Sequence, residues 1–195
     1  MQLLRLFLCF SLFASCVLAQ NSSARIIGSA LATAASAQVG VTVVYDPAYV
    51  SLKYPGGDVP MERGVCCDVV IRALRVHGVD LQKLVHEDMK ASFAAYPKMW
   101  GLKATDANID HRRVPNLMKF FGRKGKSLPV TEDDADYKPG DFVTWMLPGN
   151  LYHIGVIAGE KVSGTERPAV IHNIGQGTRQ EDVLHAFKII GHYRW

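Results

Sequence analysis

Apolar positions recur every three or four residues over much of the first two thirds of the chain, which is the spacing of a helix with one buried face. The clearest run begins at Cys66 and ends at Gly78, with Arg72 and Arg75 on the face opposite the apolar stripe. An alanine-rich segment, a segment with an aspartate at its start and a segment that begins with a proline predict three more helices. These helices are expected over residues 24–39, 80–93 and 115–121.

The C-terminal third has the pattern of β-strands, with runs rich in β-branched and aromatic residues between turn residues such as Pro148-Gly149-Asn150. Strands are predicted over residues 141–147, 152–158, 169–173 and 188–195, with a shorter one over 41–45. The glycine- and proline-rich stretch 54–64 is predicted to be a loop. Helices followed by an antiparallel meander indicate a single α+β domain in which the helices pack against one sheet.

The N-terminus indicates export. A short apolar run leads to the small-residue exit Val17-Leu18-Ala19, as in a secretory signal rather than a membrane span. We expect residues 1–19 to be a signal peptide and residues 20–195 to form an exported, periplasmic domain with no stable membrane span. The alternative is a lipoprotein anchored through Cys16, and Phe13 at the first position of that cleavage box argues against it.

Charge narrows the function classes only slightly. The chain carries 22 Lys+Arg against 18 Asp+Glu, a formal net charge of +4, and no basic cluster is interleaved with aromatic residues. A nucleic-acid-binding function is therefore not predicted. The chain beyond the predicted signal is long enough for one domain with a core. We expect it to act as a monomer on a peptide substrate, without a metal or organic cofactor.

The strongest chemical signal is a pair of adjacent cysteines, Cys66 and Cys67, which are the two of the four cysteines that follow the predicted signal. Neighbouring Cα atoms lie about 3.8 Å apart, whereas disulfides favour roughly 5.5–6 Å, so this pair cannot staple a fold. An exported protein that keeps such thiols uses them for chemistry rather than for its framework. The N-terminus of a helix favours a thiolate and can hold an oxyanion. Cys66, at the start of a predicted helix, is therefore the candidate nucleophile.

A thiol nucleophile needs a base, and histidine suits neutral pH. His153 begins the apolar run of a predicted strand, and His172 lies on the following strand. If the two strands pair as neighbours, His172 can orient His153 through its second ring nitrogen. Asn173 is the alternative orienting residue, although strand alternation aims it at the face opposite His172.

Three other interpretations fit the same residues. Cys66 and Cys67 can be inert buried side chains, with His153 and His172 ordinary histidines at strand ends. The cysteine pair and a histidine can form a metal or redox module, although thiolate ligands are more often spaced C-x-x-C. The domain can also be a catalytically silent binding module that keeps an enzyme's fold.

The order of the motifs resembles that of NlpC-type cell-wall cysteine peptidases. The chain offers Gly56-Gly57, then Cys66-Cys67-Asp68-Val69-Val70, Pro139-Gly140-Asp141-Phe142, His153-Ile154-Gly155-Val156 and finally His172. More closely, the segments RGVC, NIDHRRVPNL, PGD, HIG and HNIG are similar to a bacterial family of exported proteins of unassigned function. This resemblance implies a papain-like fold, hydrolysis of amide bonds in peptidoglycan stem peptides, and Cys66 as nucleophile, since threonine usually follows it in the closer family.

The chain departs from the peptidases in two places that bear on the substrate. Tyr54 stands two residues before Gly56, where the peptidase tyrosine usually stands three before, and it is a candidate substrate residue. The run Asp110-His111-Arg112-Arg113 has no counterpart in the standard peptidases. It is predicted to form a second substrate wall, with Arg112 or Arg113 binding a carboxylate through its planar fork. The alternative is a solvated helix start whose arginines pair with nearby acids.

Overall fold

The computed structural model describes residues 28–195, and the predicted signal peptide and Cys16 lie outside these residues. The helices are α2 (Cys66–Val76), α3 (Leu81–Ala91) and α4 (Val114–Arg123), preceded by helical residues 28–36. Three short 3₁₀ helices are η1 (Phe93–Ala95), η2 (Asp110–Arg112) and η3 (Asp134–Asp136). The strands are β1 (Val44–Tyr45), β2 (Arg63–Gly64), β3 (Ser127–Leu128), β4 (Phe142–Leu147), β5 (Leu151–Lys161), β6 (Pro168–Asn173), β7 (Thr178–Glu181) and β8 (Lys188–Tyr193).

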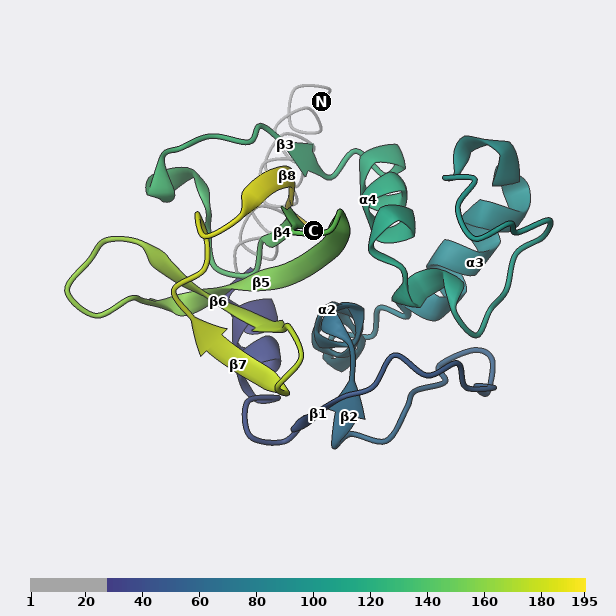
Figure 1. Ribbon diagram of the computed structural model, residues 1–195, viewed down its shortest axis with the longest axis horizontal. Helices are drawn as coiled ribbons and strands as arrows, with labels where there is room; N and C mark the ends of the chain where they lie inside the picture. Colours follow the sequence, from purple (N-terminus) through teal and green to yellow (C-terminus); the bar gives the residue numbers. More distant parts are fainter. Residues whose placement is uncertain (1–27) are drawn as a thin grey trace, which may run out of the picture.

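One antiparallel sheet organises the domain, and its strand order is β3-β8-β4-β5-β6-β7 (Figure 1). The strands β4, β5 and β6 are neighbours in the predicted order. The meander then continues into β7, which was not predicted, and the predicted C-terminal strand, β8, returns to lie between β3 and β4. A separate short pair, β1 with β2, runs parallel in the chain segment that leads to α2. The predicted α+β class is therefore confirmed.

The predicted helices are also found, because their sequence signals are strong. α2 begins at Cys66, and α3 begins after Asp80, whose side chain accepts hydrogen bonds from the backbone N–H groups of Gln82 and Lys83. This is the arrangement expected of an aspartate N-cap. The alanine-rich helix is shorter than predicted, since the described helical residues end at 36 and a turn follows.

The core lies on both faces of the sheet. On one face, α2 and α4 cover strand residues such as Ile154, Val156 and Ile171, and α2 lies directly against β5 and β6 (Figure 1). Helix α3 packs on α2 and α4, farther from the sheet. On the other face, Trp145 and Val170 pack against loop residues. Within the described residues, no helix is both long and apolar enough to cross a bilayer.

Candidate active site

Cys66 is the first residue of α2, so its side chain lies at the positive end of the helix dipole. Val65 precedes it in extended conformation, and the backbone N–H of Val65 donates to Oδ2 of Asp68 at 2.7 Å. Gly64 makes this close turn possible, because a Cβ at that position would lie 2.9 Å from Oδ2 of Asp68. The glycine and the aspartate thus fix the backbone on either side of the thiol.

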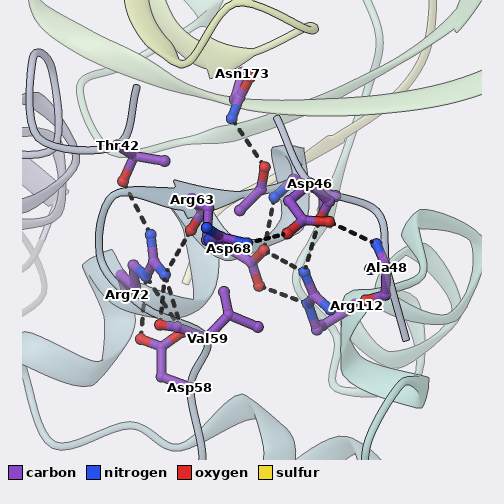
Figure 2. A network of polar contacts seen from close by, with 12 residues as sticks. Thr42, Asp46, Ala48, Asp58, Val59, Arg63, Asp68, Arg72, Arg112 and Asn173 are labelled. Carbon is purple, nitrogen blue, oxygen red and sulfur yellow. Dashed lines mark hydrogen bonds and ion pairs between the residues drawn. The ribbon is translucent and has the colours of Figure 1, made fainter. Parts of the chain in front are cut away.

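Two buried arginines hold the segment that leads into α2 (Figure 2). Arg112, from η2, makes two hydrogen bonds to the Asp68 carboxylate, at 3.0 and 2.9 Å, in a pair whose side chains are 2% and 3% exposed. Arg72, from α2, reaches the opposite side of the segment, where it binds Asp58 at 3.0 Å and the backbone carbonyl oxygen of Arg63 at 3.0 Å. The N-terminus of α2 is therefore clamped from both sides.

The predicted pairing of β5 with β6 is confirmed, and it brings the two histidines together. Val156 pairs with Ile171, so strand alternation places His153 and His172 on the same face of the sheet. Nε2 of His153 lies 2.9 Å from Nδ1 of His172. Both rings are buried. Gly155 leaves room for the His172 ring, because a Cβ there would lie 3.1 Å from Cβ of His172.

A carboxylate extends this arrangement. Nε2 of His172 lies 3.0 Å from Oε2 of Glu181, on the neighbouring strand β7. We call His153, His172 and Glu181 the histidine row. Asn173, the alternative orienting residue, points elsewhere: its side-chain N–H donates to the carbonyl oxygen of Gly64 at 3.1 Å. Asn173 thus fastens the loop before Cys66 rather than the ring of His153 (Figure 2).

The hydrogen-bond directions in the histidine row follow from its carboxylate end. A carboxylate accepts, so the proton of neutral His172 lies on Nε2 and its Nδ1 becomes an acceptor. Burial, reinforced by the charge of His153, lowers the pKa of His172 to about 4, so its ring is neutral at pH 7. Nε2 of His153 must then donate to His172. The nitrogen of His153 left for the thiol is Nδ1, as an acceptor.

The two thiols have opposite environments. A hydrogen bond from Cys67 lowers the pKa of Cys66 well below its usual value; burial opposes this shift, while His153 and the backbone N–H of Ile154 add to it. Burial raises the pKa of Cys67 well above its usual value, and the neighbouring Cys66 adds to this effect. Of the two thiols, Cys66 is therefore the one whose ionised form these surroundings favour.

The thiol of Cys66 opens on a cleft of about 340 Å³, whose lining includes Tyr45, Cys66, Trp100, Arg113, Leu151 and Tyr152. Of the predicted substrate residues, Arg112 and Arg113 line this cleft, and Tyr54, Asp110 and His111 do not. Tyr54 is exposed and packs edge-on against the ring of His86.

The alternative of a solvated helix start at residues 110–113 is wrong about solvation, because Asp110, His111 and Arg112 are buried. Its other part, that the arginines pair with acids, is confirmed for Arg112, which pairs with Asp68. Asp110 accepts a backbone hydrogen bond from Asp106. Burial, with the charge of Arg112, lowers the pKa of His111 to about 4. Most of this segment therefore packs against the start of α2 rather than facing solvent.

Residues 32–195 match the family model described as "Domain of unknown function (DUF1287)". The chain belongs to this family. It is 58% identical over 167 residues to "Uncharacterized protein YijF" of Escherichia coli (strain K12), and the match covers 85% of this chain and 80% of that protein. No solved structure matches the chain. The matched family region contains Cys66, the histidine row and the cleft.

Sequence reasoning missed three residues of this DUF1287 site. Glu181 lies on a short strand of sequence Thr-Arg-Gln-Glu, which lacks the apolar alternation that marks a strand. Asp68 stands in the sequence as one residue of the helix-start motif, and its partner lies 44 residues away in the chain. Trp100 lies in an irregular connection between η1 and η2. A single aromatic or acidic residue in such a setting carries no spacing that could identify it.

Proposed function

We propose that this protein is a cysteine hydrolase that cleaves amide bonds by acyl transfer. The observation that carries the proposal is the combination of a thiol with a depressed pKa at a helix N-terminus and a directed histidine row beside it. A cysteine with only a packing role has no need of a depressed pKa. A general base needs an imidazole nitrogen that is free to accept a proton, and the histidine row leaves one such nitrogen on His153.

The proposed reaction begins with attack of the Cys66 thiolate on the carbonyl carbon of the substrate. Backbone N–H groups at the start of α2 stabilise the oxyanion. His153, protonated in the thiolate form of the pair, gives its proton to the leaving amine as the C–N bond breaks, which leaves a thioester. Water then attacks the thioester while His153 accepts a proton, and the carboxylic acid product leaves as the thiolate is restored. His172 and Glu181 orient His153 and stabilise its charged form.

The motif order supports a papain-like arrangement of the NlpC type for this reaction. The Pro-Gly-Asp motif ends in Asp141, which is buried just before β4 and binds Nε2 of His192 at 2.7 Å and Nε of Arg194 at 2.7 Å. Asp141 thus fastens β4 to the region of β8, and β4 supports the strand that carries His153. By the same resemblance we propose peptidoglycan stem peptides as substrate and the periplasm as the location.

A digest of purified muropeptides, analysed by mass spectrometry, tests the proposed activity. The wild-type protein and Cys67→Thr should release amide-cleavage products, because threonine keeps a hydroxyl donor beside Cys66. Cys66→Ala should release none. Equal loss of activity in Cys66→Ala and Cys67→Thr would favour a site in which both cysteines act together, and product formation by Cys66→Ala would exclude the proposed nucleophile.

A further inference from the structure

Within residues 28–195, the cleft beside Cys66 contains a cation that has no anionic partner in the protein. Among its lining residues, the permanently charged side chains are those of Arg112 and Arg113. Arg112 is paired with Asp68, and it also donates to the carbonyl oxygens of Asp46 and Ala48. Arg113 forms no ion pair within the part of the chain that the structure describes. The charge of Arg113 acts on Asp110 from a distance. Burial raises the pKa of Asp110 and the charge of Arg113 lowers it in part, but the two side chains do not form an ion pair.

The guanidinium of Arg113 is held in place, but not all of its N–H groups have a hydrogen-bond acceptor in the described protein. Its Cζ lies 4.3 Å from the centre of the Trp100 ring, a cation–π contact that holds the guanidinium against the ring. Its Nη1 is buried and has no protein acceptor among the described residues. Because Nη1 is buried, a carboxylate in the cleft would bind the Nε and Nη2 side of the guanidinium, where the planar group can donate two parallel hydrogen bonds.

The ring that supports Arg113 is itself unusually placed. Trp100 is half exposed and has a φ of 62°, in the left-handed region that a bulky side chain rarely adopts. Asn150, the other non-glycine residue with positive φ in the described chain, lines the same cleft, although asparagine tolerates this conformation. Backbone strain at a residue that presents an aromatic face to a cleft is typical of ligand sites.

We infer that Arg113 and Trp100 form a carboxylate subsite of the cleft: Arg113 binds the carboxylate, and Trp100 with Leu151 contacts the aliphatic part of the same ligand. The subsite rests on the proposed function for the role of Cys66, and it defines the substrate class as peptide amides that carry a free carboxylate near the scissile carbonyl. Arg112 takes no part in this binding, because its hydrogen bonds hold α2 in place.

Calorimetric titration with matched peptide pairs tests the subsite independently of catalysis. One pair of acetylated dipeptide amides differs only in glutamate against glutamine, and a second pair differs only in a free against an amidated C-terminus. At least one acidic peptide should bind about tenfold more tightly than its neutral partner, the range expected for hydrogen bonds to a charged group. Arg113→Gln should abolish this difference, and Arg113→Lys should keep part of it.

Lys119→Gln is the matched control, because it removes one positive charge from an exposed position on α4, outside the cleft. It should leave the preference for the acidic peptide unchanged. The subsite is refuted if neither acidic peptide is preferred, or if the preference survives Arg113→Gln.

Alkylation of Cys66 by iodoacetamide, measured on the same samples, separates the two proposals. A reactive Cys66 without an acidic preference removes the subsite and keeps the hydrolase. An acidic preference that depends on Arg113 beside an unreactive Cys66 keeps the subsite and removes the hydrolase.

Discussion

At the scale of single residues, the site gives two chemically identical neighbours, Cys66 and Cys67, different surroundings. Cys66 receives a hydrogen bond from Cys67 and lies beside His153, whereas Cys67 is completely buried and has an acidic neighbour in Asp68. A threonine after the nucleophile offers the same kind of donor as the Cys67 thiol. The second cysteine is thus explained as a hydrogen-bond donor and not as a second nucleophile.

The charge of Glu181 should tune the thiol through the histidine row. In Glu181→Gln the amide oxygen can still accept from His172, but the negative charge that stabilises a protonated imidazole is lost. The thiolate–imidazolium pair then becomes less stable, so the pH at which Cys66 becomes half reactive should rise by about half a unit, given that a partly exposed charge contributes up to about 1 kcal/mol.

Iodoacetamide labelling across pH measures this shift. The melting temperature should stay near that of the wild type, because the Glu181 side chain is one third exposed. An unchanged labelling profile would show that Glu181 has no influence on the reacting groups.

At the scale of elements, the start of α2 depends on a buried ion pair. Arg112→Gln leaves the Asp68 carboxylate buried without its partner, which should cost about 3–5 kcal/mol of unfolding free energy. Arg63→Gln is the control, because the Arg63–Asp46 pair is half exposed on the arginine side and should contribute less than about 1 kcal/mol. Urea titration measures both variants, and equal small losses would contradict the clamp.

Strand β5 offers a second matched comparison. A Cβ at Gly155 would lie 2.8 Å from Cγ1 of Val170 and 3.1 Å from Cβ of His172, whereas a Cβ at Gly159 meets nothing within 4 Å. Gly155→Ala should therefore destabilise the fold by about 1–3 kcal/mol and displace His172, while Gly159→Ala should be close to neutral. Thermal unfolding together with iodoacetamide labelling would detect both effects. Similar behaviour of the two variants would argue against close packing at Gly155.

The elements that could be predicted from the sequence are those with strong periodicity or clear caps. The helix after Cys66, the Asp80 cap and the strands of His153 and His172 are of this kind, and neighbour pairing then brought the two histidines together. Glu181 could not be predicted, because its strand β7 has only four residues, is polar and lacks the apolar alternation that marks a strand. The pairing of Arg112 with Asp68 depends on tertiary packing, which turned a segment expected to face substrate into a support for the nucleophile.

At the scale of the whole molecule, the buried histidines make stability depend on pH. Burial lowers the pKa of His111 to about 4 and also lowers the pKa of His172. Between the usual histidine pKa of about 6.5 and these lower values, the unfolded chain binds more protons than the folded one. The free energy of unfolding therefore carries no penalty from these histidines above about pH 6.5. It falls as the pH drops toward 4, by at most about 3 kcal/mol for a single histidine.

Thermal melts between pH 7 and pH 4 test this dependence. His111→Leu should reduce the slope of melting temperature against pH, because it removes one side chain that takes up a proton on unfolding. His77→Asn is the control, since His77 is exposed, and it should leave the slope unchanged. A wild-type melting temperature that stays constant over this range would contradict the neutral state of the buried rings.

Iodoacetamide labelling across pH, with the labelled site mapped by mass spectrometry, tests whether Cys66 and His153 form the proposed thiolate–imidazole pair. Cys66 alone should label well below pH 8, His153→Ala should abolish this reactivity, and Cys67→Thr should retain it. Slow labelling of both cysteines near the ordinary thiol pKa of about 8.5, with no effect of His153→Ala, would contradict the proposed pair.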